Sequence, residues 1–127
     1  MIRCVRLFTG ADDQSHVQIG RLELTPGRND DLVSAAMAAS RVTAEETAAG
    51  GTLAWHTAPV RQLVVTLSGT LAFITRDGEQ FTLAPGDVLL AEDTAGSGHQ
   101  WHLVDTDPWR RLYIVLADDA EVPFVPD

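Results

Sequence analysis

The sequence is poor in the residue types that mark several common classes of protein. It contains one cysteine, no lysine and no long apolar run. A single cysteine, Cys4, excludes an internal disulfide and a cysteine-based zinc cluster, and we expect it to be buried in the first strand. The N-terminal residues include arginines and do not resemble a signal peptide or a membrane span, which favours a cytoplasmic protein.

Positive charge is also scarce. The nine basic residues are all arginine, against 18 acidic residues, and the formal net charge is −9. Nucleic-acid binding depends on clustered basic side chains, and only Arg110 and Arg111 are adjacent here. We therefore expect neither a nucleic acid nor a membrane as partner, and we expect a small molecule as substrate or ligand.

Short apolar and β-branched runs alternate with glycine, proline and aspartate turns along the whole chain. This pattern predicts an all-β sandwich or barrel of roughly eight to ten strands. The segment 29–40 is interpreted as strand-like, with a helical turn as the alternative, and 88–91 as a central strand because it is apolar on both faces. The predicted strands are 2–8, 17–24, 41–47, 53–56, 60–67, 70–75, 80–83, 88–91, 99–104 and 110–116.

Two turns are predicted to close hairpins. Gly69 is expected to join 60–67 to 70–75, and the Asp77-Gly78 pair is expected to join 70–75 to 80–83. Side chains two residues apart on a strand share a face, so Gln62 and Thr66 are expected to point to the same side.

The stretch from Gly50 to Gly69 resembles the first sequence motif of the cupins, a family of jelly-roll β-barrels. Gly50, His56, Gln62 and Gly69 stand at the positions of the glycine, first histidine, glutamate and closing glycine of that motif. Ala58 stands where the motif has its second histidine. The chain therefore matches the spacing while lacking two of the usual polar residues.

A second stretch resembles the other cupin motif. Gly96 and His99 match its end, whereas Thr94 replaces the proline and Leu103 the asparagine, and Gly86 lies two residues too far upstream. The segment 91–99 also resembles the histidine-bearing segment of a subgroup of cupins.

The resemblance implies an all-β cupin jelly-roll β-barrel forming a single domain over residues 1–127. Its core motifs lie in 50–116, the N-terminal strands in 2–48, and an acidic C-terminal tail in 117–127 is expected to pack along the surface. The resemblance also implies a homodimer, formed by sheet extension or through an outer aromatic face.

The resemblance further implies a divalent metal, Fe, Mn, Ni or Zn, held by His56, Gln62 and His99. Losing a carboxylate and an imidazole weakens such a site, because metal affinity depends on the charge and number of ligands. Without a metal, His56 and His99 remain candidate catalytic residues, since imidazoles act as general acids or bases near neutral pH.

Gln62, Thr66, Phe73 and Trp101 are the predicted substrate-binding residues, and Tyr113 is a further candidate depending on register. Asp93, after Glu92, is expected to cap the following turn rather than to serve as a catalytic carboxylate. Neither a phosphate-binding loop nor a nucleophile elbow is present. The remaining expectations place His16 and His102 on the surface, Trp55 on the face opposite His56, and Trp109 over the end of the barrel.

Three hypotheses about function follow from these residues. The first is a biosynthetic enzyme acting on a small molecule through His56 and His99, by isomerisation, cyclisation or metal-dependent oxygenation. The second is a non-catalytic module that binds a metabolite or a sugar. The third is a structural or interaction protein with a vestigial pocket.

Overall fold

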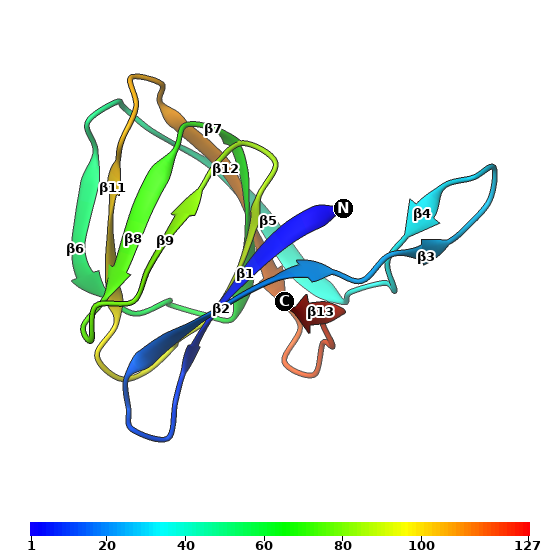
Figure 1. Ribbon diagram of the computed structural model, residues 1–127, viewed down its shortest axis with the longest axis horizontal. Coiled ribbons are helices and arrows are strands. Elements are labelled where there is room, and N and C mark those ends of the chain that lie inside the picture. The colour runs from blue at the N-terminus through cyan, green and yellow to red at the C-terminus, as the bar shows by residue number, and fades with distance from the viewer.

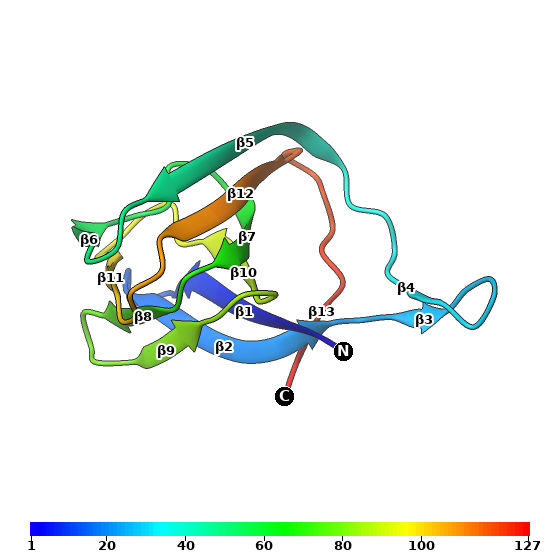
Figure 2. The ribbon, with the colours of Figure 1, turned by 90° about the horizontal axis from the view of Figure 1, so that it is seen from above.

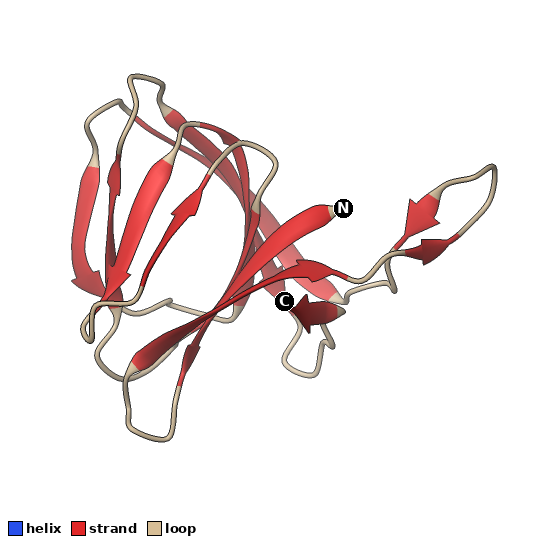
Figure 3. Ribbon diagram, viewed as in Figure 1, coloured by secondary structure: helices blue, strands red, loops and turns tan.

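A computed structural model describes residues 1–127, and every regular element in it is a β-strand (Figure 3). The all-β prediction is therefore confirmed. No helix is present that could cross a membrane. The strands are β1 (Ile2–Thr9), β2 (Ser15–Leu22), β3 (Thr25–Pro26), β4 (Leu32–Val33), β5 (Ala39–Thr47), β6 (Thr52–His56), β7 (Gln62–Ser68), β8 (Leu71–Thr75), β9 (Gln80–Leu83), β10 (Val88–Glu92), β11 (His99–Leu103), β12 (Trp109–Leu116) and β13 (Phe124–Pro126).

The strands form two main sheets, which face each other in Figures 1 and 2, and a separate hairpin. The seven-stranded sheet has the order β13-β2-β1-β10-β7-β12-β5, and the four-stranded sheet has the order β6-β11-β8-β9. Between β5 and β12, only the connection from β8 to β9 stays within one sheet. This interleaved order is that of a two-sheet jelly roll, so the predicted jelly-roll fold is confirmed.

The main core lies between the two sheets. Leu7, Leu71, Phe73, Leu89 and Trp101 belong to one cluster of buried side chains contributed by both sheets. Strand β10 lies between β1 and β7 and is buried from Val88 to Ala91, which confirms its predicted central position.

A second buried cluster lies on the outer face of the larger sheet. Cys4 and Leu90 belong to it, and the C-terminal residues Ala120 and Phe124 pack there. Burial raises the pKa of the Cys4 thiol to about 11, so this cysteine is an unreactive core residue, as the sequence predicts.

One of the two predicted hairpins is wrong. Strand β7 pairs with β10 and β12, whereas β8 pairs with β9 and β11, so the chain crosses between sheets at Gly69. Gly69 has a φ of 86°, and a Cβ there would lie 2.9 Å from the Pro108 carbonyl oxygen. The hairpin at Gly78 is confirmed by the pairing of β8 with β9.

The prediction for 29–40 is largely wrong. Apart from Ala39 and Ser40, which open β5, only Leu32–Val33 is a strand, and no helical turn is present. The β3–β4 hairpin projects from the body of the molecule (Figures 1 and 2), and Leu32 is 60% exposed. Residues 34–38 that follow are in no strand, and the Ala38 carbonyl accepts a backbone hydrogen bond from Ala117.

The C-terminal tail packs along the outer face of the larger sheet. Its residues Phe124–Pro126 also form strand β13, which the sequence does not predict and which pairs with β2 at the edge of the sheet. Gly20 permits this close approach, because a Cβ there would lie 2.2 Å from the Val125 carbonyl oxygen.

We expect Leu71→Ala to lower the free energy of unfolding by about 2–5 kcal/mol, because it leaves a cavity in the fully buried core. The matched change Leu32→Ala on the exposed hairpin should alter it by less than about 0.5 kcal/mol. Urea denaturation of both variants measures this difference. Equal losses in the two variants would contradict the assignment of the core.

Candidate functional site

A cavity of about 390 Å³ lies between the two sheets. Of the 19 residues that line it, 11 are hydrophobic. Strands β5, β12, β7 and β10 of the larger sheet form one wall, and β6, β8 and β11 of the smaller sheet form the other. The volume and the mixture of apolar and polar groups are typical of a site for a small organic ligand.

His56 and His99 lie side by side on the wall formed by the smaller sheet. They are paired in the register of β6 and β11, and their ring centroids are 4.4 Å apart. Gly98 allows this approach, because a Cβ at its φ of 76° would lie 2.4 Å from the His56 carbonyl oxygen. The two candidate catalytic residues are therefore neighbours in the cavity lining.

The hydrogen bonds of the two rings define their tautomers. Nδ1–H of His56 donates to the Ala54 carbonyl oxygen at 2.7 Å, and Nδ1–H of His99 donates to Oδ2 of Asp93 at 2.5 Å. A carbonyl oxygen or an ionised carboxylate can only accept, so the proton of each neutral ring lies on Nδ1. Nε2 of each histidine is then left with a lone pair for a ligand.

Asp93 is fully buried and holds His99 in place. Its Oδ2 also accepts a hydrogen bond from Oγ of Ser15 at 2.8 Å, while Oδ1 has no partner. The prediction that Asp93 caps the turn through Asx-type bonds is wrong, because this carboxylate bonds two side chains. Ser15 is 78 residues away in the chain, so no local pattern could have indicated the contact.

Glu92, next to Asp93, does not line the cavity. Its carboxylate lies between Arg6 and Arg61, with N···O distances of 2.6 Å to both. Burial by itself would raise the pKa of Glu92, but the hydrogen bonds from the two arginines lower it overall. Glu92 on β10 therefore bridges Arg6 on β1 and Arg61, the residue before β7.

The environment of His56 disfavours its charged form. Burial is the largest cause and lowers the pKa of His56 below 6.5, and the neighbouring His99 lowers it further. The hydrogen bond to Ala54 and the charge of Asp93 act in the opposite direction but are outweighed. His56 is therefore neutral at pH 7.

Three of the four predicted substrate-binding residues line the cavity, and one does not. Gln62, Phe73 and Trp101 line the cavity, and the carboxamide of Gln62 has no hydrogen-bond partner in the protein. Thr66 is buried but does not line the cavity, because its Oγ1 accepts a hydrogen bond from the indole of Trp109 at 3.3 Å.

Trp109 was expected to cover the end of the barrel, and this is wrong. Its side chain is 2% exposed and lines the cavity, where its ring centroid lies 4.8 Å from that of Trp101. Tyr113 also lines the cavity. Burial raises the pKa of Tyr113, which remains a neutral phenol.

Arg111 is a cavity residue that the sequence analysis missed. It is 4% exposed, stacks over Trp109 at 3.8 Å, and its Nη2 donates to Glu45 at 2.9 Å. Alternation along β12 from Tyr113 places Arg111 on the same face, and that signal could have identified it.

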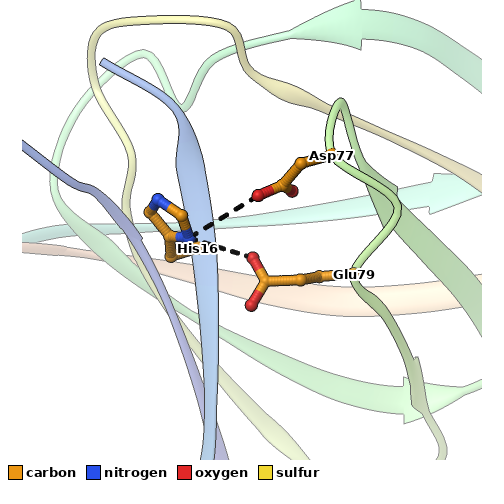
Figure 4. Close-up of side chains that lie close together, drawn as sticks. All are labelled: His16, Asp77 and Glu79. Atoms are coloured by element: carbon orange, nitrogen blue, oxygen red, sulfur yellow. Dashed lines mark hydrogen bonds and ion pairs between the residues drawn. The ribbon is translucent and has the colours of Figure 1, made fainter. Parts of the chain in front are cut away.

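Histidine 16 lies outside the cavity in an ionic cluster (Figure 4). Its Nε2 is 2.8 Å from Asp12, and its Nδ1 is 3.1 Å from Glu79 and 3.9 Å from Asp77. The hydrogen bond to Asp12 is the main cause that raises the pKa of His16. His16, Asp77 and Glu79 could together contact one cation, and they also link strand β2 to the turn before β9.

His102 and Trp55 lie on the sides of their strands that the sequence predicts. His102 is exposed next to the buried Trp101. Trp55 does not line the cavity, and the guanidinium of Arg76 lies 4.1 Å from the centre of its ring.

The cavity offers few charged ligands to a divalent metal. Nε2 of His56, Nε2 of His99 and the amide oxygen of Gln62 are all neutral donors. The only carboxylate in the lining is Glu45, which is paired with Arg111. Ala58 stands at the remaining cupin ligand position. This donor set fits a divalent ion poorly, since affinity depends on anionic ligands and their number.

No protein-family model and no curated protein matches this chain. Among solved structures, it is similar to a cupin superfamily protein from Desulfitobacterium hafniense, with a TM-score of 0.45 and 21% sequence identity. The match covers 77% of this chain and 99% of that protein. The assignment of a jelly roll rests on the strand order described above.

The lowered pKa of His56 predicts how stability depends on pH. The unfolded chain binds a proton near pH 6.5, whereas the folded protein binds it only at lower pH. The free energy of unfolding should therefore decrease as the pH falls from 6.5 towards the pKa of folded His56. Histidine NMR titration should give a pKa below 6.5, and His56→Gln should reduce the slope of stability against pH. A His56 pKa above 6.5 would contradict this burial.

Proposed function

We propose that this protein is a small-molecule enzyme that transfers a proton on an oxygenated substrate, with isomerisation or cyclisation as the result. The observation that carries the proposal is the buried Asp93–His99 pair, which leaves Nε2 of His99 free beside the cavity. A carboxylate that holds Nδ1–H of a histidine sets its tautomer and stabilises the imidazolium that forms during proton transfer.

The first chemical step is removal of a proton from a carbon next to a carbonyl group. Nε2 of His99 takes the proton, and the electrons of the C–H bond move to the carbonyl oxygen to form an enolate. The free carboxamide of Gln62 donates a hydrogen bond to that oxygen, as expected of a group that stabilises developing negative charge. Asp93 stabilises the protonated His99.

Two outcomes complete the reaction without a further reactant. In isomerisation, the substrate has a carbon–carbon double bond conjugated with the enolate, and His99 returns the proton to the far carbon of that bond, which shifts the double bond along the molecule. In cyclisation, the enolate carbon attacks a second carbonyl, and the proton passes to the new alkoxide. His56, neutral at pH 7, accepts a hydrogen bond from a substrate hydroxyl.

Two alternatives use the same cavity. In the first, His56, Gln62 and His99 hold a divalent metal such as iron, which would supply oxygenase or Lewis-acid chemistry; the neutral donors argue against it. In the second, the protein is a non-catalytic module for a metabolite or sugar, which the aromatic lining of Phe73, Trp101 and Trp109 supports.

A homodimer, a cytoplasmic location and a role in biosynthesis are also part of the proposal. Strand β5 lies at the edge of the larger sheet and exposes 58% of Val42. An unpaired, partly apolar edge strand supports a dimer formed by sheet extension.

The test is a screen of small ketones and 1,3-dicarbonyl compounds in D₂O, in which NMR measures enzyme-dependent exchange of carbon-bound hydrogen. For a compound that exchanges, His99→Ala should lower the rate by about 100-fold or more, because general-base catalysis contributes factors of this order. His102→Ala is the matched control on the same strand and should leave the rate unchanged, since His102 is exposed.

Elemental analysis of the same samples separates the alternatives. The proposal expects exchange that does not depend on added chelator. Stoichiometric metal that is lost in His56→Ala/His99→Ala, together with chelator-sensitive activity, would instead support the metal-dependent enzyme. A ligand that binds without any exchange or turnover would support the binding module.

A further inference from the structure

The lining of the cavity carries positive charge, although the protein is strongly acidic. Its charged members are Arg41, Arg111 and Glu45, which give a net charge of +1 with neutral histidines (2 − 1), against −9 for the whole chain. A cavity of this sign in an acidic protein favours an anionic ligand over a cationic one.

The two arginines differ in how they are held. Nη1 of Arg111 donates to Thr47 at 2.7 Å and to the Trp109 carbonyl at 3.1 Å, and its Nη2 pairs with Glu45. The charge of Arg111 is therefore already compensated. Arg41 makes no hydrogen bond or ion pair through its side chain and is exposed at the cavity.

An arginine without a partner is unusual in this chain. Six of the nine arginines form salt bridges with carboxylates, and Arg76 stacks on Trp55. Only Arg28, in the projecting hairpin between β3 and β4, and Arg41 have neither kind of contact. Of these two, Arg41 lines the cavity between the sheets and Arg28 does not.

The register of the larger sheet sets the distance between Arg41 and Gln62, one of the proposed reacting groups. Arg41 pairs with Val115, and Val115 pairs with Gln62 on the next strand. Adjacent strands are about 4.8 Å apart, so the backbones of Arg41 and Gln62 are separated by about 10 Å. A ligand of one or two rings can span that distance.

Flat apolar surfaces complete the lining. Phe73, Trp101, Trp109 and Tyr113 all contribute to it, and the two indoles meet edge to face, with planes 72° apart. Aromatic side chains in this arrangement favour a planar ligand, on which they can stack.

We propose that the substrate is a flat aromatic or conjugated molecule with a carboxylate or similarly acidic oxygen, and that Arg41 binds this anionic group. The inference rests on the proposed function, because it names the substrate class for the same cavity. A neutral ligand would cover the Arg41 guanidinium without compensating its charge, which disfavours binding.

The test compares 2-naphthoate with 2-naphthamide, which has nearly the same shape but no charge, by isothermal titration calorimetry. We expect the native protein to bind 2-naphthoate about tenfold more tightly, as one charge-assisted contact allows. Arg41→Gln should remove this preference. Arg28→Gln is the matched control, since it makes the same change of charge away from the cavity, and it should retain the preference.

Other outcomes overturn the inference. If neither probe binds, if both bind equally well, or if Arg41→Gln keeps the preference, Arg41 is not the anion-binding residue. His99→Ala should keep the preference for 2-naphthoate, because His99 is proposed to transfer a proton and not to bind the anion. Anion binding by Arg41 can therefore fail while proton transfer by His99 stands, and proton transfer can fail while anion binding stands. Melting temperatures establish that each variant is folded.

Discussion

The buried carboxylate of Asp93 is the contact on which the geometry of the cavity depends. Its side chain joins Ser15 at the start of β2 to His99 at the start of β11, and its backbone carbonyl accepts the N–H of Ala58. A buried carboxylate is costly unless it is hydrogen-bonded, so each of these segments is held where it satisfies Asp93. The orientation of His99 follows, and His56 is positioned against it by the pairing of β6 with β11.

The cavity combines two environments that suit different parts of one ligand. Around His56 and His99 the polar atoms are neutral donors and acceptors, and the burial of His56 keeps that ring uncharged at pH 7. Along β5 and β12 the lining carries the guanidinium groups of Arg41 and Arg111. The interior between the sheets strengthens the interactions of the buried groups there, Arg111 among them, because nearby charges are less screened than in water.

Alternation and turn chemistry predicted much of this structure. Most of the strands lie within two residues of their predicted ends, and the spacing of Gly50, His56, Gln62 and Gly69 indicated the jelly roll. Local patterns were less informative where pairing over long distances decides the outcome. Gly69 has the features of a hairpin turn, yet β7 pairs with β10 and β12, and β8 lies in the other sheet.

The sequence by itself determined the strand pattern, the acidic surface and the two histidine positions, because these follow from residue type and from a period of two along each strand. Only the tertiary structure decided what surrounds them. The carboxylate of Asp93 is shared by His99 and by Ser15, which lies 78 positions earlier in the chain, and Trp109 and Arg111 face the cavity because β12 lies between β7 and β5. Such contacts depend on how distant strands pair, and a one-residue change in register would reverse every side chain.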